Sequence, residues 1–207
     1  MLMAIDFGGH QVALLDCCSL LNLYATRHLA EILGALRVRF AVAEAVVGEA
    51  GYVLHGWSRA PTVGGAGEDA AERELVDLQP LVRAGCLEVW RPESEAEYVS
   101  FVNFAAEVDD GEAVTCALAL NRGAAVVTDD RKTLRVLARL APRVAALTTS
   151  QVLRLWADSS RVDRAVLRSV LFDVQTRTRF TPGKHDPLVG WWEGIVGSPE
   201  RRDVQRP

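Results

Sequence analysis

The sequence predicts an α/β protein built on a central parallel sheet of about five strands, with a helical extension at the C-terminus. Short apolar segments alternate with longer amphipathic ones as far as Ala157. This alternation of strand with helix is typical of a parallel sheet. Apolar residues make up 49% of the 207 residues, which is enough for a substantial core. The length suits one domain with an appended segment.

Five short segments have the composition of strands. In residues 37–42, Arg37 and Arg39 alternate with Val38 and Phe40, a period of two that suits a strand with one polar face. The predicted strands are residues 12–15, 37–42, 87–90, 124–127 and 144–147.

The segments between these strands are predicted to be helical. Residues 68–83, for example, would place Ala71, Leu75, Leu78 and Val82 on one side of an amphipathic helix. Residues 58–67 contain three glycines and a proline and are predicted to form a loop. Helices are predicted at residues 19–25, 43–54, 68–83, 93–106, 110–121, 131–140 and 150–157.

The predicted boundary after Asp158 separates a domain of residues 1–158 from an extension of residues 159–207. In the extension, residues 161–179 are predicted to form a helix whose apolar stripe packs on the core and also contacts a partner. The core itself is expected to be complete without this helix. Helical periodicity is lost after Pro182, and the polar end, residues 198–207, is expected to be disordered.

Charge is unevenly distributed along the chain. The net charge is −4, which excludes a generic polycation that binds nucleic acid through charge alone. Residues 160–207 carry nine Lys and Arg against six Asp and Glu, a net charge of +3, whereas residues 1–159 have a net charge of −7. The acidic body suits a cation site, and the basic tail either contacts a polyanion or is ordinary surface charge.

The sequence predicts a cytoplasmic protein. The N-terminus contains Asp6 and no basic segment of the kind that opens a signal peptide, and no apolar run is long enough to span a membrane. None of the four cysteines forms a Cys-x-x-Cys pair, and no histidine stands at metal-ligand spacing from them. Reduced thiols in a cytoplasmic compartment are therefore expected.

Four acidic residues stand where apolar segments meet a turn or a helix: Asp16, Glu49, Glu112 and Asp130. Carboxylates that follow parallel strands converge on the crevice where open α/β sheets bind ligands. Clustered carboxylates repel one another, so they need protons or a hard divalent cation between them. The pattern favours Mg²⁺- or Mn²⁺-dependent chemistry on a phosphodiester.

Four short motifs resemble those of PIN-domain ribonucleases, in the order and alternation of that family. The resemblance extends roughly from Gln11 to Trp156, and a closing strand and helix around Thr148 also fit. The motifs are Leu-Leu-Asp16-Cys-Cys-Ser19, Ala-Val-Val-Gly-Glu49, Asp-Gly-Glu112-Ala and Val-Val-Thr128-Asp-Asp130-Arg.

The resemblance implies a three-layer α/β/α fold and a metal-dependent endoribonuclease that hydrolyses RNA. Asp16, Glu112 and Asp130 would bind Mg²⁺ or Mn²⁺, with Glu49 as a fourth catalytic acid beside them. Many members are toxin-like (VapC-type) and belong to type II toxin–antitoxin pairs, so an antitoxin protein and a homodimer are candidate partners. The long segment between Glu49 and Glu112 and the tail after Asp158 depart from the compact pattern.

Two of the ligand positions have alternatives. Asp109 and Glu112 form a capping-box pattern, in which Glu112 would cap a helix and Asp110 would be the acidic ligand instead. Asp129 competes with Asp130, and the Thr-x-Asp pattern favours Asp130. The other of the two is expected to cap the helix that begins at Arg131.

Further residues beside the acids are candidates for supporting roles. The hydroxyls of Ser19 and Thr128 would hold a carboxylate or a water, or would only cap local backbone. Three arginines that recur along one helix face are candidates for binding RNA phosphates, with a solvated helix face as the alternative. They are Arg131, Arg135 and Arg139.

Other functions are compatible with acids at strand ends. One is a different Mg²⁺-dependent phosphoryl-transfer enzyme or a receiver-type module, although a receiver needs a lysine at a strand end and the chain has only Lys132 and Lys184. The other is a non-catalytic PIN-like module that binds a partner, which the retained acids disfavour. Fold resemblance alone does not decide among these functions.

Overall fold

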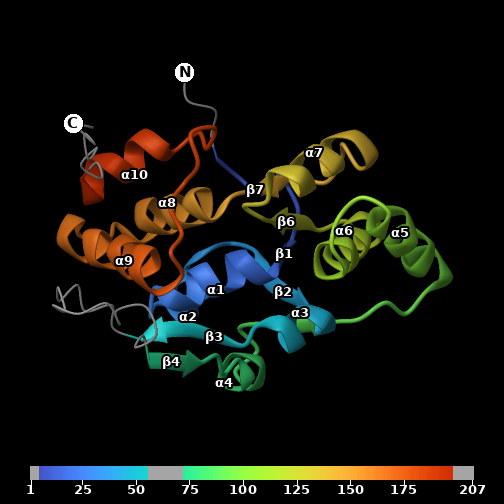
Figure 1. The fold of residues 1–207 in the computed structure, drawn as a ribbon, viewed down its shortest axis with the longest axis horizontal. Helices are drawn as coiled ribbons and strands as arrows, with labels where there is room; N and C mark the ends of the chain where they lie inside the picture. Colours follow the sequence, from blue (N-terminus) through green and yellow to red (C-terminus); the bar gives the residue numbers. More distant parts are fainter. Residues whose placement is uncertain (1–4, 56–71, 198–207) are drawn as a thin grey trace, which may run out of the picture.

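The computed structural model describes residues 5–55 and 72–197, and the predicted loop at 58–67 and the polar end at 198–207 lie outside them. A five-stranded sheet forms the centre (Figure 1). Its strands lie in the order β5-β2-β1-β6-β7, and every neighbouring pair is parallel. The strands are β1 (Val12–Leu15), β2 (Arg39–Ala43), β5 (Glu88–Trp90), β6 (Ala125–Val127) and β7 (Ala146–Leu147).

The predicted α/β class and all five predicted strands are confirmed. The two central strands β1 and β6 are buried along their whole length, which explains why they read as continuous apolar runs rather than alternating ones. The strand order places β1 in the middle of the sheet, so that the chain winds outward from β1 in two directions. Ligands bind at such a reversal point, outside the carboxyl ends of the strands.

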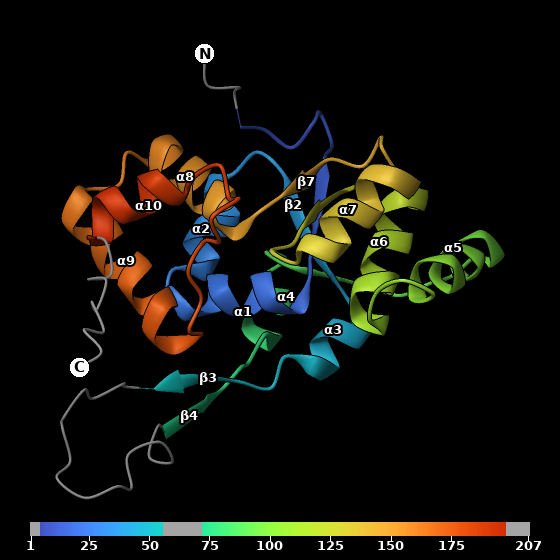
Figure 2. The same ribbon diagram turned by 45° about the horizontal axis from the view of Figure 1, so that its top comes forward.

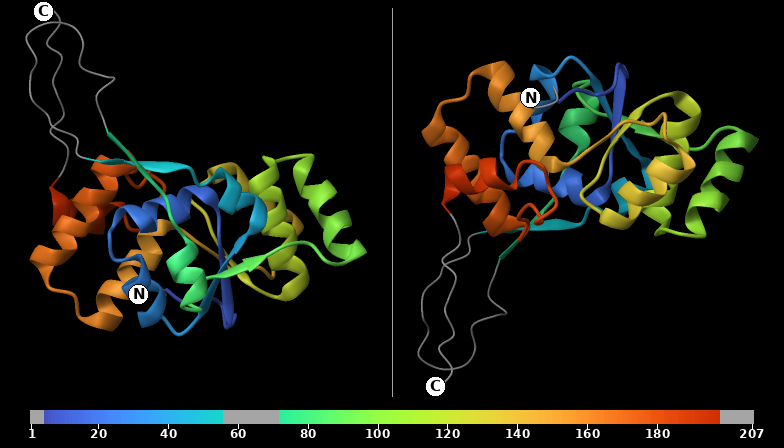
Figure 3. Two further views of the ribbon diagram at one scale, coloured as in Figure 1. Left: turned by 90° about the horizontal axis from the view of Figure 1, so that it is seen from below. Right: turned by 90° about the horizontal axis from the view of Figure 1, so that it is seen from above.

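Helices cover both faces of the sheet and give a three-layer α/β/α arrangement, consistent with a PIN-like fold (Figures 1 and 3). On one face α6 packs on β1, β2 and β6, with α5 outside it. On the other, α1 and α8 pack together and contact α2. The helices of this central part are α1 (Cys17–Ala25), α2 (Leu29–Ala35), α3 (Glu44–Glu49), α4 (Gln79–Arg83), α5 (Glu95–Ala105), α6 (Asp110–Arg122), α7 (Arg131–Leu140) and α8 (Thr149–Ser160).

Two predicted helices are wrong in part because tertiary pairing overrides local propensity. The helix predicted at 43–54 ends with α3, and β3 (Tyr52–His55) follows it. The helix predicted at 68–83 is replaced, within the described residues, by β4 (Glu72–Leu75) and the short α4. β3 and β4 pair in an antiparallel ribbon below the main sheet (Figure 2), and Pro80 starts α4 in the first turn, where no backbone N–H is needed.

The C-terminal extension packs on the core of the domain. The predicted helix is α9 (Arg164–Arg177), and a second helix that the sequence did not suggest, α10 (Val189–Val196), packs on it. The predicted apolar stripe of α9 is buried and belongs to the same hydrophobic cluster as the sheet. The buried extension side chains include Leu167, Val170, Leu171, Val174 and Trp192.

The buried end of α9 also ties the β3–β4 ribbon to α1. Arg177 is only 3% exposed, and its guanidinium donates hydrogen bonds to the carbonyls of Ala25 (2.7 Å) and Leu54 (3.3 Å). It also forms an ion pair with Glu74. The predicted boundary at Asp158 lies within α8, so α8 continues through it without a break.

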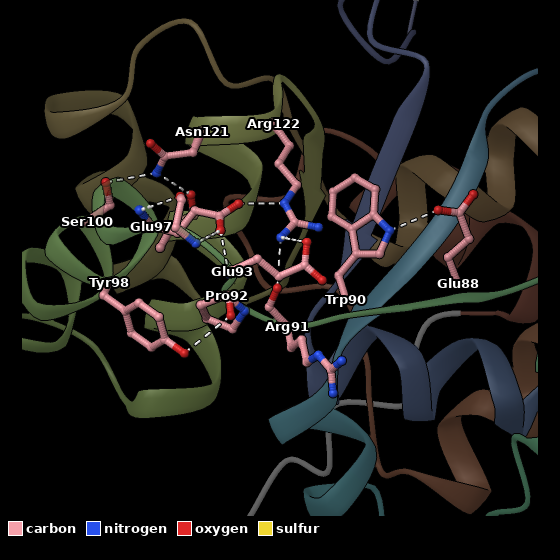
Figure 4. A network of polar contacts seen from close by, with 12 residues as sticks. Glu88, Trp90, Arg91, Pro92, Glu93, Glu97, Tyr98, Ser100, Asn121 and Arg122 are labelled. Carbon is pink, nitrogen blue, oxygen red and sulfur yellow. Dashed lines mark hydrogen bonds and ion pairs between the residues drawn. The ribbon is translucent and has the colours of Figure 1, made fainter.

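A polar network fixes α5 to the end of α6 (Figure 4). Ser94 and Glu97 form a reciprocal capping box at the start of α5. The buried Glu97 carboxylate accepts a 2.5 Å hydrogen bond from Arg122 Nε, and the Arg122 guanidinium lies over the Trp90 ring. The hydrogen bond from Arg122 lowers the pKa of Glu97 to about 2, from an ordinary value of 4.5.

Replacing Glu97 with Gln is expected to lower the free energy of unfolding by about 2 kcal/mol at neutral pH, because a charge-assisted hydrogen bond is lost. The folded-state pKa lies below the unfolded one, so the contribution is present above pH 4.5 and is lost as the pH falls toward 2. Urea unfolding at a series of pH values measures this. Glu95→Gln, an exposed change in the same helical turn, is the control, and an equal loss in both variants would contradict the assignment.

Within the described parts of the chain, no helix is long and apolar enough to cross a membrane.

Candidate active site

The candidate site lies at the carboxyl ends of β1 and β6, where the strand order reverses. Leu15 is in register with Val127, and the Asp16 N–H donates to the Val127 carbonyl at 3.1 Å. Asp16 and Thr128 therefore leave the sheet side by side. The Thr128 N–H donates to the Leu147 carbonyl at 2.9 Å, which continues the ladder to β7.

Asp16 is the most deeply buried acid of the site, with only 3% of its surface exposed. It is the N-cap of α1, and its Oδ1 accepts a 2.6 Å hydrogen bond from the Ser19 N–H. Burial raises its pKa from 3.8 to about 6, and a hydrogen bond with the Thr128 hydroxyl opposes the rise. The Ser19 hydroxyl also lies near this carboxylate, but it makes no regular hydrogen bond within the described residues.

Asp130 lies at the start of α7 and caps that helix itself. Its Oδ1 accepts a 2.7 Å hydrogen bond from the Thr133 N–H, and its own N–H donates to the Thr128 hydroxyl at 3.1 Å. The Thr128 hydroxyl thus caps the local backbone at Asp130, which is the alternative role predicted for it, and also interacts with the Asp16 carboxylate. Asp130 remains exposed and lines the pocket described below.

Asp129 is held in a different environment from its neighbour. Its Oδ1 accepts from the Thr149 N–H at 2.9 Å, and its Oδ2 accepts from the side chains of Thr149 and the buried Asn22. Burial raises the pKa of Asp129, and these hydrogen bonds oppose the rise. Asp129 therefore joins α1 to α8, whereas the sequence suggested that the residue not used as a ligand would cap α7.

Glu112 lies in the first turn of α6 and faces the other acids. Burial raises its pKa, and the negative charges of Asp130 and Asp16 raise it further. Interactions with the Thr133 hydroxyl and the Asp109 backbone N–H oppose the rise. Asp109 itself makes no side-chain cap, and Glu112, unlike Asp110, lines the pocket.

Glu49 reaches the site from the end of α3. Its carboxylate lies directly against the backbone of Gly111, where a Cβ atom would stand only 2.5 Å from Glu49 Oε2. Burial, together with the negative charges of Glu49 and Asp16, raises the pKa of the Cys17 thiol to about 11. Asp16, Glu112 and Asp130 therefore lie near enough for their charges to interact, and Glu49 lies against Gly111, the residue before Glu112.

The three predicted RNA-binding arginines do not share one environment. Arg131 and Arg135 are exposed and line the pocket beside the acids. Arg139 does not line it and instead forms an ion pair with Glu107.

A pocket of about 770 Å³ opens over this centre. It is lined by Cys18 of α1 together with Glu112, Asp129 and Asp130. The loop between α9 and α10 lines it as well, through residues 180, 181 and 183–187, and sequence reasoning did not connect this loop with the site. The only sequence signal for it was the basic charge of the tail.

The donor set suits a hard divalent cation. Carboxylate oxygens are the ligands that Mg²⁺ and Mn²⁺ prefer. Beside them the buried Thr133 hydroxyl, like that of Ser19, has no regular hydrogen-bond partner in the described residues, although it lies near Glu112. Among residues 5–55 and 72–197, however, no three His, Cys, Asp or Glu side chains are already close enough together to coordinate one ion. Binding would therefore require rotation of the more exposed Glu112, Asp130 or Glu49 side chains toward Asp16.

Comparison with protein families, curated proteins and solved structures finds no match for this chain. The interpretation of the site therefore depends on its own geometry and chemistry.

Proposed function

We propose that this protein is a metal-dependent endoribonuclease that hydrolyses RNA phosphodiester bonds. The observation that supports it best is the proximity of Asp16, Glu112 and Asp130 at the point where the strand order reverses, with Glu49 against the neighbouring Gly111. A buried carboxylate with a raised pKa is stabilised as an anion by a bound cation. Arg131 and Arg135, which line the same pocket, suit a polyanionic substrate.

Asp16, Glu112 and Asp130 would hold Mg²⁺ or Mn²⁺, with Glu49 beside them. When bound, such a cation supplies Lewis-acid chemistry, because it stabilises charge on a phosphate and makes water a better nucleophile near neutral pH. The chain's own residues orient these ligands: the Thr128 hydroxyl interacts with the Asp16 carboxylate and accepts from the Asp130 N–H, and the N-terminal turns of α1 and α7 fix one carboxylate oxygen of each acid. Arg131 and Arg135 can bind the phosphates of the substrate strand.

The same geometry disfavours a receiver-type module. Lys132 is exposed on α7 and does not line the pocket, and Lys184 comes from the C-terminal loop rather than from a strand end. A role as the toxin of a toxin–antitoxin pair is the narrower proposal and rests on the sequence resemblance. A small DNA-binding protein encoded directly upstream would support it.

The test of the function is a matched pair of neighbouring substitutions. Asp130→Asn is expected to keep the α7 cap, since Asn caps as well as Asp, but to lower the rate of RNA cleavage in Mn²⁺ at least about 100-fold. Asp129→Asn is expected to retain most of the cleavage while lowering stability by about 1–3 kcal/mol, because its amide cannot accept all three hydrogen bonds. Initial rates on an unstructured RNA and thermal melts measure both.

Two results would contradict the proposal. If the wild-type protein shows no metal-dependent cleavage of RNA, the proposed function is wrong. The second result is a folded but inactive Asp129→Asn protein together with an active Asp130→Asn protein. It would show that the ligand at this strand end is Asp129.

A further inference from the structure

The loop of residues 180–187 lies over the candidate site although it follows it by about 50 residues in the chain. It connects α9 to α10 and runs alongside α1 and α8 (Figures 1 and 2). It contributes more residues to the pocket than any other segment. The function proposed above assigns no role to it.

The loop is anchored on both sides of its exposed tip. Pro182 and Leu188 are buried, and the Asp186 carboxylate accepts hydrogen bonds from the buried Ser150 hydroxyl at 2.7 and 2.8 Å. The Asp186 N–H also donates to the Gly183 carbonyl at 2.9 Å, which closes a turn. Because the backbone is held in this way, the side chains at the tip can bind a ligand without a large loss of loop entropy.

The tip and α7 present unpaired positive charge to the pocket. Lys184 and His185 are exposed at the tip, and Arg131 and Arg135 line the pocket from α7. Within the described residues, Lys184, Arg131 and Arg135 form no ion pair, although four carboxylates line the same pocket: Glu112, Asp129, Asp130 and Asp186. The three cations therefore stay available for an external anion.

We propose that Lys184 and Arg135, which line the same pocket as the acids, form a phosphate-binding subsite for the RNA backbone. This inference rests on the proposed nuclease function and adds that the C-terminal extension is part of the substrate site. The volume of about 770 Å³ exceeds what a single phosphate needs, so the pocket has room for a nucleotide. Phosphates next to the scissile bond would contact Lys184 and Arg135, while the acids would lie at the scissile phosphate itself.

The chain offers a matched control, because Lys132 and Lys184 are its only lysines. Both are exposed, but Lys132 does not line the pocket. The variants are therefore Lys184→Gln, Arg135→Gln and Lys132→Gln. Thermal melts of all three are expected to match the parent protein, since none of these side chains is buried.

Affinity for a fluorescent oligouridine is measured by anisotropy at several salt concentrations, in an Asp16→Asn background so that the probe is not cleaved. Lys184→Gln and Arg135→Gln are each expected to weaken binding roughly tenfold. Each should also reduce the slope of log K against log salt by about 0.7, the value for one phosphate contact to a single strand. Lys132→Gln should change neither quantity. With the active site intact, Lys184→Gln should raise KM and leave kcat nearly unchanged.

The outcomes separate this inference from the proposed function. If the protein cleaves RNA but Lys184→Gln has the parent's affinity, salt slope and KM, the subsite is wrong and the function stands. If the parent binds the oligouridine through Lys184 but never cleaves RNA in Mg²⁺ or Mn²⁺, the subsite stands and the nuclease function is wrong. If the parent neither binds nor cleaves, both are wrong.

Discussion

Replacing Asp16 with Asn is expected to stabilise the metal-free protein by up to about 3 kcal/mol at neutral pH, while abolishing cleavage. Burial raises the pKa of this carboxylate from 3.8 to about 6, so its ionised form is disfavoured in the folded state. Asparagine has nearly the same shape, accepts the same hydrogen bond from the Ser19 N–H, and caps α1 equally well. The substitution therefore removes the buried charge and keeps the local structure.

The effect has a defined pH dependence. The folded-state pKa of Asp16 lies above the unfolded value of 3.8, so the folded protein binds the proton more tightly. The metal-free wild type consequently loses stability as the pH rises from about 4 to about 6, and the loss is complete above that range. The advantage of Asp16→Asn should appear across the same interval. Urea unfolding in EDTA at several pH values measures it.

Divalent metal should reverse the ranking of the two proteins. A cation that binds only the folded state raises its melting temperature, so Mn²⁺ should stabilise the wild type and leave Asp16→Asn unchanged. Asp110→Asn is the control, because this exposed carboxylate does not line the pocket. A destabilised Asp16→Asn protein at every pH would show instead that the charge of Asp16 supports the metal-free fold.

Truncation after Asp158 is expected to abolish folding. The shortened chain loses part of α8 and five buried apolar side chains from α9 and α10, each of which stabilises the fold by about 1.5–3 kcal/mol. Their sum reaches the total stability of a typical domain, about 5–15 kcal/mol. It also loses Arg177, whose absence leaves the carbonyls of Ala25 and Leu54 without this donor.

Circular dichroism and size-exclusion chromatography of the purified truncation measure this outcome. A chain that lacks only residues 198–207 is the control, and we expect it to keep the circular dichroism and elution of the full chain. A folded, monomeric protein ending at Asp158 would show that the sheet and its first helices are stable alone. The domain boundary predicted from the sequence would then be correct.

The parts of the fold that sequence predicts well are those determined by local pattern. The central strands follow from short apolar runs between amphipathic segments, and the acids that follow them could be placed at one edge of the sheet. The β3–β4 ribbon could not be predicted, because residues 72–75 form a strand only by pairing with residues 52–55 and by the contact of Glu74 with Arg177. Such long-range pairing leaves no periodic signal in the chain.

In the candidate site, too, residues marked by a local motif could be predicted, whereas contacts with partners distant in sequence could not. The Thr-x-Asp pattern singled out Asp130, but not the hydrogen bonds of Asp129 to Asn22 and Thr149, since these partners are distant in sequence. The loop of residues 180–187 was equally beyond prediction. Its position depends on how α9 packs, and on Asp186 reaching Ser150 across 35 intervening residues.

At Gly111, the residue that would best stabilise the helix differs from the residue that leaves room for the Glu49 carboxylate. Alanine favours a helix interior over glycine by about 1 kcal/mol, and α6 alone would gain part of this from a methyl group at Gly111 in its first turn. That methyl would occupy the space of the Glu49 carboxylate, which can move aside at little cost because it ends a flexible side chain. A more stable protein with one acid turned away from the other three would result. Selection for thermal stability alone would therefore tend to lower the proposed activity of this protein without altering any of its acidic residues.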